Sequence, residues 1–209
     1  MKQKSDKIKS QAGFTLIELL AVIAIMALIS TALVIDFNRQ RGPRNIVLAK
    51  NETITNLRKV QGYMLSSRNI PPNNTPAKYY IATFDAKETP NSYTVAAVDN
   101  DYVYHPGVET ISLPDSVIFS NLTINRPDGV KGDPLAYKCM QIIFSAPFGK
   151  MYVNGSETCD GSIVDILKDP VSLAELSENK ASIYFSELSG TVQDAYLEIV
   201  PVTGQMSAY

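Results

Sequence analysis

The chain has 209 residues, which is room for one folded domain and an additional anchoring element. Hydrophobic residues make up 45% and charged residues 19%, a composition that allows a sizeable core and excludes disorder throughout the chain. The formal net charge of -2 argues against a nucleic-acid-binding body, which would normally show a basic face, so no nucleic-acid contact is predicted.

Residues 1–13 form a short basic leader. Four lysines stand against one acidic residue, Asp6, which gives this segment a net charge of +3 and leaves -5 for the remainder of the chain. The lysines are Lys2, Lys4, Lys7 and Lys9. Basic residues beside a membrane-spanning segment stay on the cytoplasmic side, so we expect the rest of the chain to face outward.

Residues 14–35 form an apolar stretch of 22 residues with a single charge, Glu18. As a helix this stretch would be ~33 Å long, which matches a hydrocarbon core of ~30 Å. A secretory signal peptide would have a shorter apolar stretch and a cleavage site after it, and no such site follows residue 35. The stretch predicts a membrane-spanning helix, and composition leaves a plain signal anchor open as an alternative.

Glu18 is the unusual residue of this helix. An ionisable group placed centrally in a spanning segment costs ~2.5–3.5 kcal/mol on insertion scales, and less near an end. Such a carboxylate usually has a functional partner. The alternative is a carboxylate that the helix dipole stabilises while the side chain reaches the interface, and the residues alone leave both open.

The eight residues from Gly13 to Leu20, Gly-Phe-Thr-Leu-Ile-Glu-Leu-Leu, resemble the processing motif of type IV prepilins and type II secretion pseudopilins. The resemblance implies that a membrane prepilin peptidase cuts between Gly13 and Phe14 and N-methylates Phe14. It also implies that Glu18 pairs with the N-terminal amine of a neighbouring subunit during filament assembly. The two desolvated charges would stabilise each other, and polar pairs select partners between membrane helices.

A second helix is expected after a break at Gly42-Pro43, because proline removes a backbone donor and disfavours helix at the residue before it. Helical character resumes from about Asn45 to Arg68, and the proline-rich stretch that begins at Ile70 ends it. An imperfect apolar stripe at three- and four-residue spacing predicts that this helix packs on a β-sheet. The stripe is Val47, Ile54, Leu57, Val60 and Met64.

The remaining chain reads as short β-strands separated by turns. The expected strands are 78–84, 92–98, 101–105, 108–113, 117–125, 138–146, 150–154, 181–186, 194–202 and 205–208. A helical turn is expected only near Ser172–Glu178. The predicted fold class is α+β: a long N-terminal helix, membrane-spanning in its first half and kinked near Gly42-Pro43, packed on an antiparallel β-rich head. The expected domains are 1–13, 14–35, 36–70 and 71–209.

A second resemblance lies within the β region. Residues 143–149, Ile-Phe-Ser-Ala-Pro-Phe-Gly, resemble an element of the GspH/FimT-type minor pseudopilins, and residues 199–206 are similar to their closing hairpin, with its turn at Thr203-Gly204. The two cysteines, Cys139 and Cys159, do not bracket the C-terminal region as they do in many major type IV pilins. The resemblance therefore favours a minor subunit.

The same two cysteines are neither a metal-binding quartet nor a C-x-x-C pair. Outside the cytoplasm a disulfide could join Cys139 and Cys159 across a loop of about 20 residues, which is worth ~3 kcal/mol by loop entropy. Two unpaired, part-buried thiols are the alternative. The sequence gives no Cα–Cα distance and leaves the choice open.

No catalytic set is visible, and no enzyme activity, cofactor or metal is predicted. His105 is expected to be a surface or packing residue, and Asp99–Asp101, or Asp128 with Asp133, to form solvated turns in preference to a calcium site. The predicted function is a structural one, as a subunit of a type IV pilus-like or type II secretion pseudopilus filament. The alternative is a membrane-anchored extracytoplasmic binding module that does not polymerise.

The resemblance also implies the partners and the location. The expected partners are the prepilin peptidase, other pilins or pseudopilins in a helical filament, an inner-membrane assembly platform, and membrane lipid before assembly. The chain would span the inner membrane once, with its head outside the cytoplasm, and would then enter a periplasmic or cell-surface filament. Whether that filament serves secretion, DNA uptake, adhesion or motility does not follow from the sequence.

Overall fold

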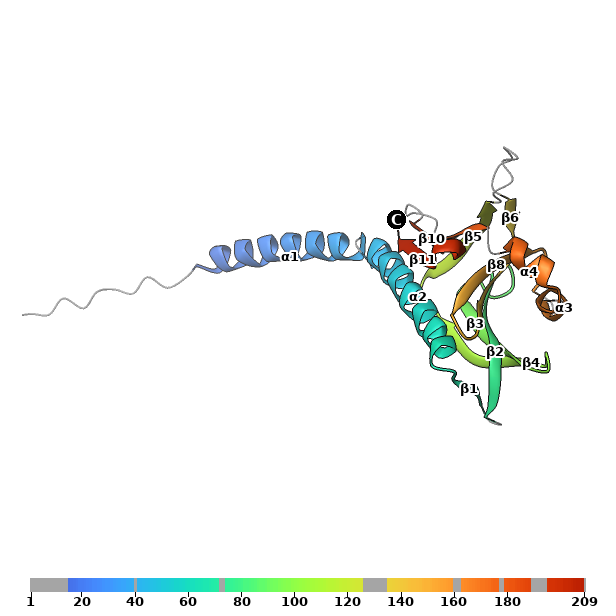
Figure 1. Ribbon diagram of the computed structural model, residues 1–209. Helices are drawn as coiled ribbons and strands as arrows, with labels where there is room; N and C mark the ends of the chain where they lie inside the picture. The colour runs from blue at the N-terminus through green and yellow to red at the C-terminus, as the bar shows by residue number, and fades with distance from the viewer. Residues whose placement is uncertain are drawn as a thin grey trace, which may run out of the picture. The chain divides into compact units, whose positions relative to one another are not determined.

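The computed structural model describes residues 15–39, 41–71, 74–125, 135–159, 163–176, 179–188 and 195–208. It divides into two units, residues 1–41 and 42–209, and each unit is described by itself. Figure 1 shows the elements of both units along the chain. The class is α+β, as predicted, with an N-terminal apolar helix followed by antiparallel β-sheets.

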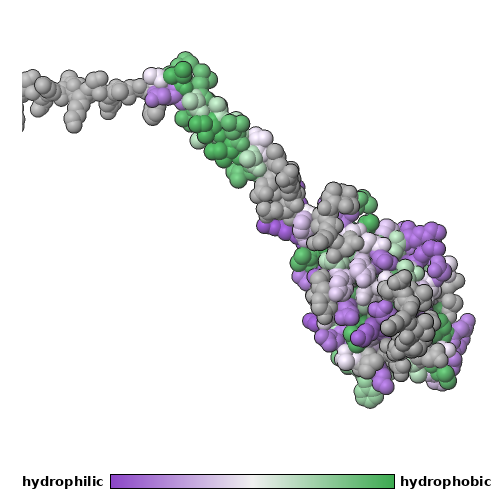
Figure 2. All heavy atoms as spheres, turned by 90° about the horizontal axis from the view of Figure 1, so that it is seen from above, coloured by the Kyte–Doolittle hydropathy of each residue, from purple (hydrophilic) through white to green (hydrophobic). Residues whose placement is uncertain are grey.

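Helix α1, Leu16–Arg39, is the regular element of the first unit. Large apolar side chains from Leu16 to Leu33 are exposed on every side of it, and Figure 2 shows a mostly hydrophobic surface over this part of the helix. A helix that is apolar all round has no face suited to water. It therefore needs lipid, or other apolar helices, around it.

Helix α2, Arg41–Leu65, has one buried side and one exposed side. It begins four residues earlier than expected, because Gly42-Pro43 falls inside its first turn. Proline is tolerated there, since the first amides of a helix have no intrahelical acceptor. Helix α1 ends at Arg39, and residue 40 lies outside the described residues. The buried side holds the residues Gly42, Ile46, Ala49, Lys50, Thr53, Leu57, Val60, Tyr63 and Met64.

The larger of two antiparallel sheets has, among the described residues, the strand order β4-β3-β2-β7-β8, with β1 paired to β2. Its strands are β1 Asn69–Ile70, β2 Thr75–Asp85, β3 Ser92–Asp99, β4 Tyr104–Ser112, β7 Cys139–Ser145 and β8 Lys150–Ser156. Strand β7, which is buried along its whole length, lies between β2 and β8.

The smaller sheet has the described order β11-β10-β9-β5-β6. Its strands are β5 Val117–Asn125, β6 Leu135–Tyr137, β9 Lys180–Glu187, β10 Ala195–Val200 and β11 Gln205–Ala208. A single 3-10 turn, η1 at Pro201–Thr203, and Gly204 with a φ of 65° connect β10 to β11. Glycine adopts this left-handed conformation without strain, so the closing hairpin predicted from Thr203-Gly204 is present.

The main core is formed by the inner faces of both sheets and the buried side of α2. Phe84, Tyr93, Phe119 and Phe185 form an aromatic chain through it, with ring centroids 4.7–6.2 Å apart. The sheets approach closely at Gly155, where a Cβ atom would lie 2.5 Å from a methyl carbon of Ile124 and 2.8 Å from the Tyr137 ring.

Two short helices cover part of the opposite face of the larger sheet. They are α3, Ile163–Lys168, and α4, Pro170–Leu176. Ile163 and Leu167 of α3 are buried in a second cluster with Tyr79, Ile81 and Ile143 of the sheet. Alternate residues of a strand point to opposite faces, so this cluster and the main core lie on the two sides of β2.

Two sequence expectations about the head are wrong. Residues 101–105 and 108–113 were expected as separate strands, but β4 is one strand from Tyr104 to Ser112 that contains Pro106 and Gly107. An edge strand tolerates proline because its outer amides have no partner strand. The helix α3 was missed because six residues, four of them Ile, Val or Leu, do not show a helical period.

The turn expected near Ser172–Glu178 is the helix α4. The expected turn at 127–129 lies outside the described residues.

Candidate processing and assembly site

The N-terminus of α1 is closed by a reciprocal pair of hydrogen bonds between Thr15 and Glu18. The Glu18 Oε2 atom accepts hydrogen bonds from the Thr15 backbone N–H at 2.9 Å and from the Thr15 hydroxyl at 2.9 Å. In return, the Glu18 backbone N–H donates to the Thr15 Oγ1 atom at 3.3 Å. This arrangement is a capping box, in which a Thr and a Glu three residues later satisfy each other's free amides.

The capping box gives Glu18 a local role that the sequence reading missed, although Thr-x-x-Glu before an apolar run is its known signature. The carboxylate is exposed and is held beside the first turn of α1. An anionic group in this position is also favoured by the helix dipole. Glu18 is therefore fixed next to the residue that follows Phe14, while Gly13 and Phe14 themselves lie outside the described residues.

The helix that follows is long and apolar enough to cross a membrane. The window Leu16–Leu33 has a mean hydropathy of 2.5, and none of it is buried within the chain. A signal sequence would satisfy the same criterion, so length and composition do not decide between an anchor and a cleaved segment. The residues around the Gly13-Phe14 junction give additional information on this choice.

Residues 8–34 match the family model described as the prokaryotic N-terminal methylation motif. The chain carries the prepilin motif of type IV pilins and pseudopilins. The prepilin motif covers the end of the basic leader, the Gly13-Phe14 junction, the capping box and nearly all of the apolar window. Neither the search among curated proteins nor the search among solved structures found a match.

The prepilin motif supports a type IV pilin-like protein or pseudopilin that prepilin peptidase processes, and it implies assembly with other pilins. Together with the apolar helix, it fits a pilin anchored in the membrane by a single pass. Proteins with this motif are structural and not enzymatic. The match to the family model does not test the resemblance to the GspH/FimT subfamily, because it ends at residue 34 and that resemblance lies in residues 143–149 and 199–206.

The structure joins Cys139 and Cys159 in a disulfide, with Cα atoms 5.4 Å apart. The sequence left open whether these two cysteines form a disulfide or remain two unpaired thiols, and the structure has the disulfide. Cys139 is the first residue of β7, and Cys159 lies between β8 and α3. The bond therefore ties the segment that leads from β8 to α3 to the first residue of β7, beside the edge strand β8.

Asp99 and His105, which the sequence gave no reason to pair, are in contact. The His105 Nε2 atom lies 3.0 Å from Asp99 Oδ2, while Asp99 Oδ1 accepts the backbone N–H groups of Asp101 and Val103. The hydrogen bond from His105, and next the one from Val103, lower the pKa of the Asp99 carboxyl below its ordinary value. The carboxylate acts as the centre of a turn, and in the described part of the chain no group of three metal-ligating side chains is found. Asp128 and Asp133 lie outside the described residues.

Proposed function

We propose that the protein is a structural subunit of a type IV pilus-like or type II secretion pseudopilus filament, and a minor subunit in preference to the major one. The match of residues 8–34 to the prepilin motif carries the proposal. The minor role rests on the resemblance of residues 143–149 and 199–206 to GspH/FimT-type pseudopilins and on the internal position of the cysteines.

The mature chain would begin at Phe14. Prepilin peptidase cuts between Gly13 and Phe14 and methylates the new amine, which removes residues 1–13 and their net charge of +3. The chain waits in the inner membrane with lipid around α1 and its head outside the cytoplasm. An assembly platform in that membrane then moves α1 into the filament, where other α1-type helices replace lipid. In the oxidising compartment outside the cytoplasm, the Cys139–Cys159 disulfide forms.

The mature N-terminus tests processing directly. Mass spectrometry of the protein from its native membrane is expected to find N-methylated Phe14 as the first residue. A chain that starts at Met1, or one cleaved after residue 35, would show that the motif is not used. The first of these results would favour the alternative, a membrane-anchored extracytoplasmic binding module that does not polymerise.

Glu18 is proposed to pair with the Phe14 amine of a neighbouring subunit. In the filament core both charges are desolvated, so each one alone would be unfavourable. Glu18→Ala is therefore expected to keep membrane insertion and processing but to lose filament incorporation, measured as the variant's share of the sheared filament fraction.

The capping box requires a matched control for this experiment, because Glu18→Ala also removes a helix cap. Thr15→Val removes the hydroxyl half of the box and leaves the Glu18 carboxylate in place. Incorporation of Thr15→Val at the wild-type level, with loss in Glu18→Ala, assigns the effect to the carboxylate. Equal loss in both variants would mean that only the cap matters, and normal incorporation of Glu18→Ala would remove Glu18 from assembly.

A further inference from the structure

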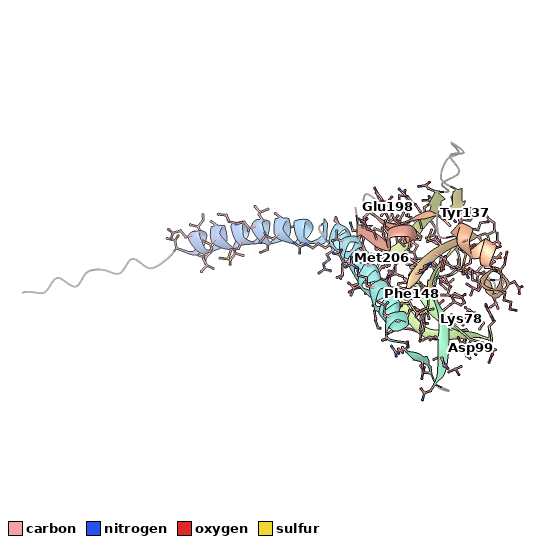
Figure 3. All side chains as sticks on the ribbon, in the orientation of Figure 1. Lys78, Asp99, Tyr137, Phe148, Glu198 and Met206 are labelled. Carbon is pink, nitrogen blue, oxygen red and sulfur yellow. A yellow bond between two sulfur atoms is a disulfide. The ribbon has the colours of Figure 1, made fainter. Side chains whose placement is uncertain are left out.

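A pocket of about 320 Å³ opens beside the Cys139–Cys159 disulfide, and both cysteines line it. The disulfide closes the open end of the β7–β8 hairpin, whereas the turn of that hairpin lies at its other end, where Figure 3 labels Phe148. Neither of the two core clusters of the described residues includes a cysteine. The disulfide therefore borders open space at the surface of the head.

The two cysteines differ in their exposure and in how the backbone holds them. Cys139 is 1% exposed and is the first residue of β7, where it pairs with Asp85 of β2 and Ser156 of β8. Cys159 is half-buried and belongs to no helix or strand. Of the two residues, Cys159 is therefore the one that a molecule in the pocket can reach.

The side chains that line the pocket carry no excess of positive charge, which would stabilise a thiolate. Lys87 and Lys138 stand against Asp85, Glu88 and Glu157. Lys138 pairs with Glu157 at 2.8 Å, and the Asp85 carboxylate accepts the backbone N–H groups of Lys87 and Glu88, each at 2.8 Å. Access to the sulfur atoms, and not the charge around them, is the difference on which the inference rests.

The backbone next to Cys139 can hold the Cys159 thiol in place when the bond is open. The Phe84 carbonyl oxygen lies 3.7 Å from the Cys159 Sγ atom, and a cysteine thiol is a weak hydrogen-bond donor. Phe84 precedes Asp85, which is the partner of Cys139 across β2 and β7. This contact keeps the two thiols of a reduced head close together, so that closure of the bond is an intramolecular step.

We propose that Cys159 is the residue that exchanges with a thiol–disulfide oxidoreductase outside the cytoplasm, and that Cys139 closes the bond. In the reduced head, the Cys159 thiolate attacks the disulfide of the oxidised enzyme, which gives a mixed disulfide and a thiolate on the enzyme. The Cys139 thiolate then attacks the Cys159 Sγ atom, and the second enzyme sulfur leaves. The head loses two electrons and two protons, and the enzyme gains them as its dithiol. The inference rests on the location of the head in the proposed function.

The wild-type protein tests which sulfur is accessible without any substitution. Reduced glutathione is added to the purified full-length chain, the exchange is stopped with acid, and free thiols are alkylated. Mass spectrometry is expected to find glutathione on Cys159, with the alkyl group on Cys139, roughly tenfold more often than the reverse arrangement, because attack depends on access. Glutathione on Cys139, or on both residues equally, would overturn the proposal.

Single variants test the same difference in the direction of oxidation. Cys139→Ser leaves the Cys159 thiol, and Cys159→Ser leaves the Cys139 thiol. Oxidised glutathione is expected to modify the first variant roughly tenfold faster than the second in the folded protein, and both at similar rates in concentrated urea, where burial is lost. A variant that reacts equally fast with and without urea is unfolded, and the result for the wild type then decides.

The class of the partner is tested in cells. Cys139→Ser cannot complete the second step, so it is expected to accumulate a mixed disulfide between Cys159 and a protein with a dithiol active site. Non-reducing electrophoresis separates this complex, and mass spectrometry identifies both cysteines. Cys159→Ser and the variant with both changes are the controls and should give no such complex. Adducts of Cys159 with glutathione alone, or with a second copy of the chain alone, would overturn the enzyme as the partner.

The outcomes separate this inference from the function on which it rests. The N-terminus and the disulfide of the wild-type chain are measured in the same cells. A disulfide in a chain that begins with N-methylated Phe14, with no complex trapped through Cys159, would overturn the exchange site alone. Free thiols at both Cys139 and Cys159 of the wild type would overturn the location of the head as well.

Discussion

At the scale of single residues, three carboxylates in the described part of the chain satisfy backbone amides at the start of a helix or in a turn. Glu18 caps α1, Asp99 organises the turn between β3 and β4, and Asp169 accepts hydrogen bonds from the amides of Val171 and Ser172 at the start of α4. Each of these bonds favours the charged form of the acid. The capping box could be predicted from Thr-x-x-Glu, whereas the contact of Asp99 with His105 could not, because it depends on how β4 returns beside β3.

Asp99 gives a stability prediction that depends on pH. Its hydrogen bonds to His105, Val103 and Asp101 lower the pKa of the carboxyl in the folded state, so the charged form stabilises the fold at pH values above the unfolded pKa of ~3.9. That contribution is lost as the pH falls through the lower, folded pKa. Asp99→Asn is therefore expected to cost roughly 1–3 kcal/mol at pH 7 and much less near pH 2, measured by urea unfolding.

Asp101→Asn is the matched control, since Asp101 is an exposed carboxylate in the same turn. It should have little effect at either pH, because exposed side chains of this kind contribute little to stability. A loss in Asp99→Asn that is as large at pH 2 as at pH 7 would contradict a role for the Asp99 charge.

At the scale of elements, the sequence predicted those with a strong pattern and missed those that depend on their neighbours. The apolar helix, most of the amphipathic stripe of α2 and strands such as β5 follow from hydropathy and period. The stripe was wrong at Val47, which is exposed, whereas Leu57, Val60 and Met64 are buried. The continuous strand β4 and the short helix α3 do not, since Pro106 is tolerated only because β4 is an edge strand, and α3 is stabilised by burial of Ile163 and Leu167 against the sheet.

The disulfide is the second anchor of α3, which leads to a prediction for this element. Replacing both Cys139 and Cys159 with serine removes a crosslink that spans 20 residues, with an expected loss of ~3 kcal/mol in the free energy of unfolding. We expect the region around α3 to open before the rest of the head unfolds, because the bond ties the segment before α3 to β7. Limited trypsin digestion is expected to cut after the exposed Lys168 sooner in the double variant than in the wild type.

A reductant supplies the control for this experiment. It should accelerate cleavage after Lys168 in the wild type and leave the double serine variant unchanged. Equal cleavage rates of the wild type and the double variant without reductant would show that burial alone holds α3 on the sheet.

At the scale of the whole molecule, the N-terminal motif and the fold class could be recognised in the sequence, but the division of charge between faces could not. The totals of +5 for residues 41–68 and -5 for residues 157–178 can be counted in the sequence. Their location depends on the larger sheet, which has α2 on one face and α3 on the other. The pairing of strands over long sequence distances decides this, and the local pattern of residues does not contain it.

The edge of the larger sheet that β4 forms affects how the head can pair with other chains. Strand β4 pairs with β3 on one side, contains Pro106, which has no amide hydrogen, and is paired irregularly between Val95 and Ala97 of β3. Proline and irregular pairing both prevent an edge strand from acting as a template for further strands. The β4 edge is thereby protected from pairing with a strand of another chain, which is the first step toward amyloid-like aggregation.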